Sequence, residues 1–303
     1  MAVQRATELR LLLVAMAVAA VTARGAAGGG AAKVPAIFVF GDSTVDVGNN
    51  NYLAGISARA DFPHNGVDFP GGEPTGRFSN GLIGVDFIAA AMGFTRSPPP
   101  YLSLIAMDAN SSGEVMSNMM MAAASAMKGA SFASGGSGVL DSTVRIKFSK
   151  TILILHVISV IMMDMFVDCD VIQNPTGECI EPLNQLAKRL NGEIRDLFRD
   201  LSSEMQGMKY SIASSYELIS SLIENPQAAG FVEVKSACCG GGGKFNAEEA
   251  CTPSSSCCAD RSRYLFWDLL HPTQATSKIV GLAFYDGAAR FVSPITFKQL
   301  ADA

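Results

Sequence analysis

Residues 34–51 read VPAIFVFGDSTVDVGNNN, and this stretch indicates both a fold and a site. The run at 34–40 is short and apolar and ends at Gly41, which is typical of a buried parallel strand that feeds a loop. Ser43 follows directly, and functional groups of parallel sheets gather at the carboxyl ends of their strands. A serine in this position is more often a turn or a helix cap, so a catalytic role requires a base elsewhere in the chain.

Apolar patterns along the rest of the chain alternate between strand-like and helix-like segments. Leucines and isoleucines three and four residues apart make 181–205 the clearest helix. The expected strands are 34–40, 129–134, 152–163 and 208–213, and the expected helices are 81–92 (capped by Asn80 and stopped by Gly93), 115–127, 181–205, a short helix before Pro226, and Pro272 to about Phe291. This alternation predicts an α/β fold, with a parallel sheet flanked by helices.

Length and charge limit the class of protein. The chain has 303 residues, 49% of them hydrophobic and 17% charged, which suits one globular domain, here 33–303. The formal net charge is −5 and no basic run stands out. Nucleic acid and anionic membranes are therefore poor partners.

The N-terminus has the pattern of a secretory signal peptide, expected at 1–24. Arg5 and Arg10 precede an apolar run at 11–21, and small residues follow, with Val-Thr-Ala at 21–23 as a cleavage site. A run of this length is too short to cross about 30 Å of hydrocarbon. We therefore expect secretion and no stable membrane insertion.

Five cysteines lie between residues 238 and 258, in a segment rich in glycine and serine. They are Cys238, Cys239, Cys251, Cys257 and Cys258. Adjacent cysteine pairs lack the usual spacing of a zinc site and no histidine is near, so disulfides are favoured over a metal. The total of seven is odd, so at least one thiol stays free or pairs between chains. Asn110 begins the usable glycosylation sequon, Asn-Ser-Ser.

One of the three histidines has the setting of a general base. His156 lies inside an apolar run, as a core histidine would, and His64 lies in a loop without an acidic partner at a telling spacing. His271 follows Asp268 by three residues. In such a turn the carboxylate accepts the Nδ1 proton and leaves Nε2 free as a base. Asp268 as a simple helix cap is the alternative, but it accounts for the histidine less well.

Five strings together resemble the plant GDSL esterase/lipase family of SGNH hydrolases. They are FVFGDSTVDVGNNN, FPGGEPTGRFSNG, GASFASGGSGVLDS, SACCGGGGKFNAEEACT and YLFWDLLHPTQA. The likeness covers roughly 34–140 and 176–300. It implies a flavodoxin-like three-layer α/β/α sandwich. It also implies a secreted, apoplastic, monomeric hydrolase of small-molecule or lipid esters that needs no metal or cofactor.

The resemblance also implies roles for individual residues. Ser43 is the nucleophile, His271 the general base and Asp268 its orienting carboxylate. Two oxyanion donors are the backbone amides of Ser43 and Gly136, with Gly135 as the alternative to Gly136. Glycine suits such a place because the amide must approach the substrate closely.

The chain departs from the family pattern at the third oxyanion donor. The family has a Gly-x-Asn-Asp motif after its central strand, but this chain has Ile161 for the glycine and Met163 for the asparagine. A thioether donates no hydrogen bond, and losing one donor typically costs about 10²–10³ in turnover. We expect an ester hydrolase of reduced activity that works through an acyl-enzyme. A catalytically silent protein that binds acyl or cell-wall ligands is the alternative.

A second departure concerns length. Compared with the family, a helix and an interior strand are absent between 140 and 176. The cause is either a naturally short variant or a faulty gene model. We expect strand 208–213 to pair directly with 152–163 in a four-stranded sheet, with helix 181–205 as the crossover. Disorder or strain is expected at 140–151 and 166–176. A product that does not fold stably is the remaining alternative.

Overall fold

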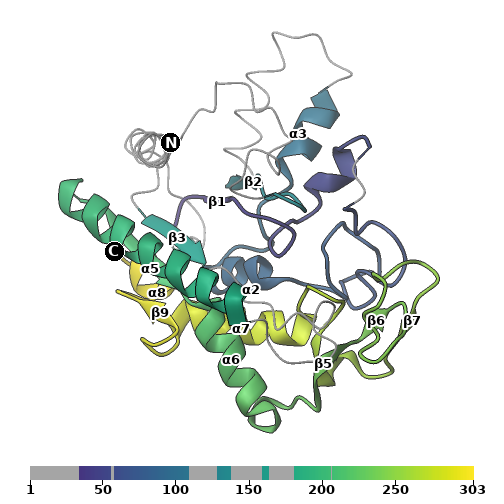
Figure 1. Ribbon diagram of the computed structural model, residues 1–303. Helices are drawn as coiled ribbons and strands as arrows, with labels where there is room; N and C mark the ends of the chain where they lie inside the picture. The colour runs from purple at the N-terminus through teal and green to yellow at the C-terminus, as the bar shows by residue number, and fades with distance from the viewer. Residues whose placement is uncertain (1–33, 56–57, 109–127, 138–158, 164–180, 206) are drawn as a thin grey trace.

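The computed structural model describes residues 34–55, 58–108, 128–137, 159–163, 181–205 and 207–303 (Figure 1). Its elements in chain order are β1 (Ile37–Val39), η2 (Asn49–Tyr52), α2 (Gly84–Ala91), α3 (Tyr101–Asp108), β2 (Gly129–Ser131), β3 (Ser159–Met163), α5 (Glu181–Glu204), β4 (Lys209–Ala213), α6 (Ser215–Glu224), η3 (Pro226–Ala229), β5 (Glu233–Ala237), β6 (Cys239–Gly240), β7 (Ser256–Cys257), η4 (Arg261–Arg263), β8 (Tyr264–Phe266), α7 (Gln274–Asp286), β9 (Val292–Ser293) and α8 (Phe297–Ala301). Helices and short sheets are mixed along the chain, as expected of an α/β protein. The three-layer sandwich itself stays a prediction.

Parallel pairing joins the strands that the sequence analysis singled out. β1 pairs with β2, from Ile37 opposite Gly129 to Val39 opposite Ser131. β3 pairs with β4 in parallel register, which confirms the direct pairing expected for these strands. β9 adds to the other edge of β4 in antiparallel orientation. The helix α5 lies between β3 and β4 in the sequence and is the crossover element expected there.

The four-stranded sheet was a wrong expectation for the described part of the chain. There, β1–β2 and β3–β4–β9 are separate sheets, and β5–β8 and β6–β7 are two further pairs. The physical reason lies in strand length, since β1 and β2 have three residues each and offer few backbone groups to a third strand.

The main core fixes the helix that follows the candidate histidine. α2 and α7 run side by side (Figure 1). Their contact is close at Gly281, where an added Cβ would lie 2.8 Å from Phe87 Cβ and 3.0 Å from the Gly84 carbonyl oxygen. The buried members of this core come from α2 and its C-cap, β4, α6, the loop before β5, β8, α7, β9 and α8: Ile88, Met92, Ala213, Leu218, Ile219, Leu222, Phe231, Leu265, Phe266, Val280, Phe284, Val292 and Phe297. Because α7 is buried along this face, its N-terminus holds a defined position.

The start of α2 differs from the sequence expectation. The helix begins at Gly84, three residues later than predicted, and the Asp86 carboxylate accepts the Ile83 amide at 2.9 Å. Asn80, predicted to cap this helix, instead accepts the Gln274 amide at 2.9 Å, at the start of α7. The helix ends before Gly93, which has a left-handed φ of 91°, as predicted.

α7 is shorter than expected at both ends. It begins after Thr273, whose hydroxyl accepts the Thr276 amide, so Pro272 lies before the helix rather than in its first turn. It ends at Asp286, before Gly287. The segment to Phe291 predicted as helix is therefore a turn that leads into β9.

Disulfides confirm the interpretation of the cysteine segment. Cys238 is bonded to Cys258, and Cys239 to Cys251. Among the cysteines that the structure describes, Cys257 is the free one, and it is exposed. This agrees with the expectation, from the odd total of seven cysteines, that at least one thiol stays free or pairs between chains.

Several sequence predictions lie outside the described residues. They are the signal peptide 1–24, the glycosylation site Asn110, the helix 115–127, His156, and the segments 140–151 and 166–176. For the strand predicted at 152–163, the structure describes β3 at its carboxyl-terminal end. Within the described ranges, no helix is long and apolar enough to cross a membrane.

Candidate active site

The turn after β1 presents Ser43. Asp42 accepts hydrogen bonds from the Thr44 amide at 2.9 Å and the Thr44 hydroxyl at 2.7 Å, which closes a tight turn around the serine. Gly41 has a φ of 156°, and a Cβ there would lie 2.6 Å from Val45 Cγ2. Glycine is therefore required for the chain to turn so sharply at the end of the strand.

The turn after β8 presents His271. Asp268 Oδ1 accepts the backbone amides of Leu270 at 2.8 Å and His271 at 2.7 Å. Both Asp268 carboxylate oxygens lie 2.8 Å from His271 Nδ1. One carboxylate thus fixes the backbone of the turn and the orientation of the ring, as the Asp-x-x-His spacing predicts.

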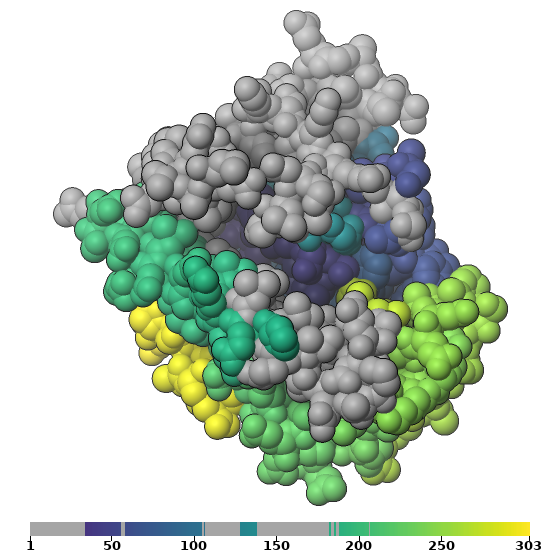
Figure 2. Space-filling view, viewed as in Figure 1, coloured from purple at the N-terminus to yellow at the C-terminus, as the bar shows by residue number. Residues whose placement is uncertain are grey.

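The two turns meet at a hydrogen bond between residues 228 positions apart. Ser43 Oγ lies 2.8 Å from His271 Nε2. His271 is 5% exposed and Asp268 9% exposed, so their contact is sheltered from water. With the Nδ1 proton donated to Asp268, Nε2 is the acceptor for the Ser43 hydroxyl proton. Figure 2 shows purple N-terminal and yellow C-terminal residues meeting in a hollow on this face.

Neighbouring aromatic residues hold the histidine turn in place. The rings of Phe78 and His271 have centroids 4.9 Å apart and are tilted by 33°. Trp267 is fully buried after β8, and its indole N–H donates to Asn65 at 2.9 Å. Its own amide donates to the His271 carbonyl at 2.7 Å. These contacts restrict the imidazole to the orientation that faces Ser43.

A buried carboxylate, Asp46, connects the serine loop to the loop after β2. Its Oδ1 accepts the amides of Gly48 and Asn49, each at 2.7 Å, and its Oδ2 accepts the Gly135 amide at 2.9 Å. Burial raises the pKa of Asp46 above its ordinary value, although the backbone hydrogen bonds act in the opposite direction. The Gly135 amide is therefore committed to a structural hydrogen bond.

The expected oxyanion donor Gly136 has a different setting from Gly135. It is exposed and has a left-handed φ of 83°. Among the described residues no hydrogen-bond acceptor for its amide is found. Its N–H can therefore bind a group outside the protein. The geometry favours Gly136 over Gly135 as a donor.

Two asparagines reinforce the same loop. The Asn49 amide nitrogen donates to the carbonyls of Ser131 and Ala133, each at 2.7 Å. The Asn50 amide oxygen accepts the Ser134 hydroxyl. Both asparagines are almost completely buried. The side chains of η2 thus fix the backbone that leads from β2 to the glycines.

Met163, in the position where an asparagine donor is expected, is the last residue of β3 and pairs with Ala213 of β4. β3 and β1 belong to different sheets. The described contacts do not bring Met163 to Ser43. Its relation to an oxyanion site stays a prediction.

Comparison with known proteins identifies the family. No family model matches the chain. The GDSL esterase/lipase At5g55050 of Arabidopsis thaliana is 31% identical over 357 residues, which covers 91% of this chain and 92% of that protein. The GDSL esterase/lipase At4g16230 of the same plant is 29% identical, with 89% and 92% covered. The chain belongs to the GDSL esterase/lipase family.

The same comparison bears on the length of this GDSL protein. The alignment with At5g55050 is 357 residues long, which exceeds the 303 residues of the chain. That relative therefore carries segments without a counterpart here. The shortening predicted between 140 and 176 lies largely outside the described residues and stays a prediction.

The residues that support this GDSL site were not predicted from the sequence. Asp46, Asn49 and Asn50 belong to the quoted string VDVGNNN but received no role. The signal for them was the density of short polar side chains directly after a strand, which is unusual unless they bond the backbone. Phe78 gave no comparable signal.

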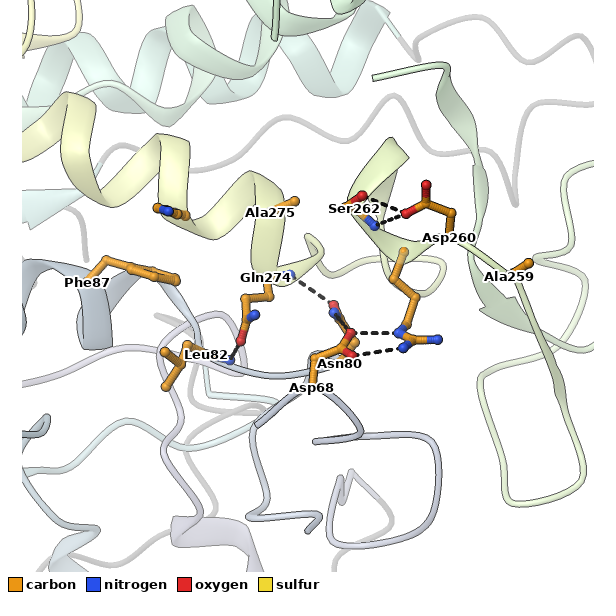
Figure 3. Close-up of a pocket in the computed structure, with 11 residues that line it drawn as sticks. Asp68, Asn80, Leu82, Phe87, Ala259, Asp260, Ser262, Gln274 and Ala275 are labelled. Atoms are coloured by element: carbon orange, nitrogen blue, oxygen red, sulfur yellow. Dashed lines mark hydrogen bonds and ion pairs between the residues drawn. The ribbon is translucent and has the colours of Figure 1, made fainter. Parts of the chain in front are cut away.

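A cavity of about 420 Å³ is lined by residues from the N-terminal part of α7, from the segment before α2 and from η4 (Figure 3). Its polar side chains bond one another: Arg261 binds Asp68 through two contacts of 2.6 and 2.8 Å, and Gln274 accepts the Leu82 amide at 2.6 Å. Neither the serine nor the histidine of the site lines it. We interpret this network as the attachment of the FSNGL segment at 78–82 to α7.

The other histidine in the described part of the chain, His64, has a different partner from His271. His64 Nε2 lies 3.2 Å from the Pro253 carbonyl, far from His271 in the chain. Within the described ranges, no three histidine, cysteine or acidic side chains are grouped so that they could hold a metal ion.

Proposed function

We propose that this GDSL protein hydrolyses carboxylic esters, with Ser43 as nucleophile, His271 as general base and Asp268 as the carboxylate that orients it. The supporting observation is the continuous line of contacts from Ser43 Oγ to His271 Nε2 and from His271 Nδ1 to Asp268, each 2.8 Å long. These distances lie within the range for proton transfer between a nucleophile and its base. The family membership supports the same reaction class.

The reaction has two halves. As Ser43 Oγ attacks the ester carbonyl carbon, its proton passes to His271 Nε2, and the carbonyl oxygen becomes an oxyanion. The tetrahedral intermediate then expels the alcohol, which takes the proton from His271. In the second half, His271 removes a proton from water, which attacks the acyl-Ser43 ester. The second tetrahedral intermediate then releases the carboxylic acid as His271 returns that proton to Ser43 Oγ.

Oxyanion stabilisation rests on two backbone amides, those of Ser43 and Gly136. The commitment of Gly135 to Asp46 supports this assignment over its neighbour. Met163 contributes no donor, so we expect turnover about 10²–10³ below that of an enzyme with a third donor. The triad and two amides together still provide catalysis.

The substitution at Met163 also favours a second candidate, a catalytically silent protein that binds acyl or cell-wall ligands at the same hollow. Secretion is part of both proposals. The apolar N-terminal run and the two disulfides support it.

Hydrolysis of a short-chain ester by the purified protein, compared with Ser43→Ala, tests the enzyme against the silent binder. We expect slow turnover that Ser43→Ala abolishes. Turnover that survives in Ser43→Ala would contradict the role of Ser43. Absence of turnover in a folded wild-type protein would favour the silent binder.

A further inference from the structure

An aromatic cluster lies at the carboxyl ends of β1 and β2. Phe40 is the first residue after β1 and Phe132 the first after β2. Their rings are nearly parallel, 7° apart in plane, with centroids 5.0 Å apart. Tyr101 of α3 lies against Phe132, with centroids 4.6 Å apart. We call these three residues the aromatic cluster.

One member of the aromatic cluster is open to solvent. Phe40 is 52% exposed, whereas Phe132 and Tyr101 are half-buried. Because Phe132 covers one face of the Phe40 ring, its opposite face is the open one. The preceding residue, Val39, packs into a separate buried cluster with Val45. Phe40 is therefore an exposed aromatic ring at the edge of a buried cluster, followed by the exposed residues Gly41 and Asp42.

The aromatic cluster is tied to both proposed oxyanion donors. Phe40 precedes Ser43 by three residues, which places their Cα atoms at most about 11 Å apart. Phe132 precedes Gly136 by four residues. The two loops are joined directly, because the Ser134 amide donates to the Gly41 carbonyl at 3.0 Å. Figure 2 shows the purple and teal segments that contain these residues adjoining within the hollow.

We propose that the aromatic cluster is a subsite for the acyl group of the ester, and that it selects acyl groups ending in a flat aromatic ring. This inference rests on the proposed function. An exposed apolar surface beside a reactive serine fits the apolar part of a substrate. The parallel stack makes the preference specific, since a further aromatic ring on the open face of Phe40 gains stacking energy that a saturated group does not.

Two esters of equal length separate ring stacking from simple burial. Methyl 3-phenylpropanoate and methyl 3-cyclohexylpropanoate differ only in the ring, and the saturated ring is the more apolar. Their binding to Ser43→Ala, which cannot consume them, is measured by titration calorimetry. We expect the phenyl ester to bind about 2- to 12-fold more tightly. Phe40→Leu in the same background should abolish this preference while keeping an apolar side chain.

Leu282→Ala is the matched control, because Leu282 is 48% exposed on α7 outside the site, and the preference should persist there. Urea unfolding checks that each variant is folded. Equal binding of the two esters, or a preference that survives Phe40→Leu, would overturn the subsite. Failure of the proposed function is recognised separately, by turnover that is absent in the wild type or that survives in Ser43→Ala.

Discussion

Asp46 accepts the Gly135 amide at a distance of 2.9 Å between Oδ2 and the nitrogen. Asp46, three positions after Ser43, thereby holds the loop that contains Gly136. Ser43 and Gly136, the proposed nucleophile and oxyanion donor, lie in the loops after β1 and β2, and this hydrogen bond joins the two loops. The buried Asp46 side chain is therefore a candidate for a positioning role in the proposed site.

We predict that Asp46→Asn weakens both the fold and the reaction. The amide side chain keeps one acceptor oxygen and presents an N–H₂ group where a second acceptor is needed. One of the three backbone amides now bound by Asp46 loses its partner, which costs about 1–3 kcal/mol of unfolding free energy. Displacement of Gly136 should lower the rate at which a fluorophosphonate labels Ser43. Urea unfolding and labelling kinetics measure the two effects.

Asp260→Asn is the control for this prediction. Asp260 is exposed and accepts the Ser262 amide in a cap that asparagine also forms well. It should change neither unfolding nor labelling. Wild-type labelling by a folded Asp46→Asn protein would show that this carboxylate does not position the oxyanion loop.

A pH-dependent contribution to stability is expected from Asp68. The hydrogen bonds from Arg261 lower the pKa of Asp68 in the folded protein. The ionised carboxylate therefore favours the fold above its unfolded pKa of about 3.9, and this stability is lost as the pH falls through the lower folded pKa. Because solvent screens the pair, we expect Asp68→Asn to cost about 0.5–1 kcal/mol at pH 7.

The test of Asp68 is urea unfolding between pH 3 and 7. The difference in unfolding free energy between wild type and Asp68→Asn should become smaller toward pH 3. Asp286→Asn, which removes an exposed pair with Lys298, should show little change at any pH. If this difference in unfolding free energy does not change with pH, the ion pair is not its cause.

The three residues assigned to the triad could be predicted from sequence because their signals are local. Ser43 follows an apolar strand, and Asp268 lies one turn before His271. Both features depend on spacing within a few residues. The helices α5 and α6 were likewise predictable from the spacing of their apolar residues. The contact between Ser43 and His271 itself followed only from the chemical need for a base.

The supporting contacts could not be predicted because their partners are remote in sequence. Asn80 precedes an apolar run, as a helix cap would, yet its side chain binds the start of α7. Pro272 is a favoured first-turn residue, but the Thr273 hydroxyl provides the cap instead. In both cases a tertiary hydrogen bond decides between two locally acceptable positions.

Restoring the missing oxyanion donor should raise activity. We predict that Met163→Asn combined with Ile161→Gly increases ester turnover about 10- to 1000-fold, the range for one donor. The glycine is included because a β-branched side chain restricts the turn that would aim the amide. Ile161→Gly alone adds no donor and should give no increase. Unchanged turnover in a folded double variant would mean that β3 does not end at the oxyanion site.

A buried ion pair supports the segment before Phe78. Arg77 binds both Asp86 oxygens, at 2.9 and 2.8 Å, and the two side chains are 9% and 7% exposed. Arg77→Met leaves a buried carboxylate without its cation and should lower the free energy of unfolding by about 3–5 kcal/mol. This is a large part of the free energy of unfolding of a typical domain, which is about 5–15 kcal/mol. Thermal or urea unfolding measures this loss.

Two further variants test the cause of that loss. Adding Asp86→Leu to Arg77→Met should recover part of the stability, because no buried charge then remains. Arg189→Met, which breaks an exposed pair with Glu193, should leave unfolding nearly unchanged. Asp86→Leu alone is measured as well. If the loss of unfolding free energy in the double variant equals the sum of the losses in Arg77→Met and Asp86→Leu, packing rather than the unpaired charge is responsible.

The last prediction concerns the pairing of β3 with β4. The parallel register runs over five residues, from Ser159 opposite Lys209 to Met163 opposite Ala213. Ile212 of β4 is buried against Phe198 of α5, so the crossover helix covers this sheet as a right-handed βαβ unit requires.

Such a pair exchanges its backbone amide protons only when the unit opens. Hydrogen exchange should therefore show β3 and β4 protected to a similar degree and the flanking ends of the two strands exchanging faster. A β4 that is protected by β9 alone would instead show slow exchange at Ile212 and Ala213, which face β9, and fast exchange throughout β3. That pattern would overturn the direct pairing. Because α5 depends on this sheet for its buried face, its amides should lose protection together with those of β4.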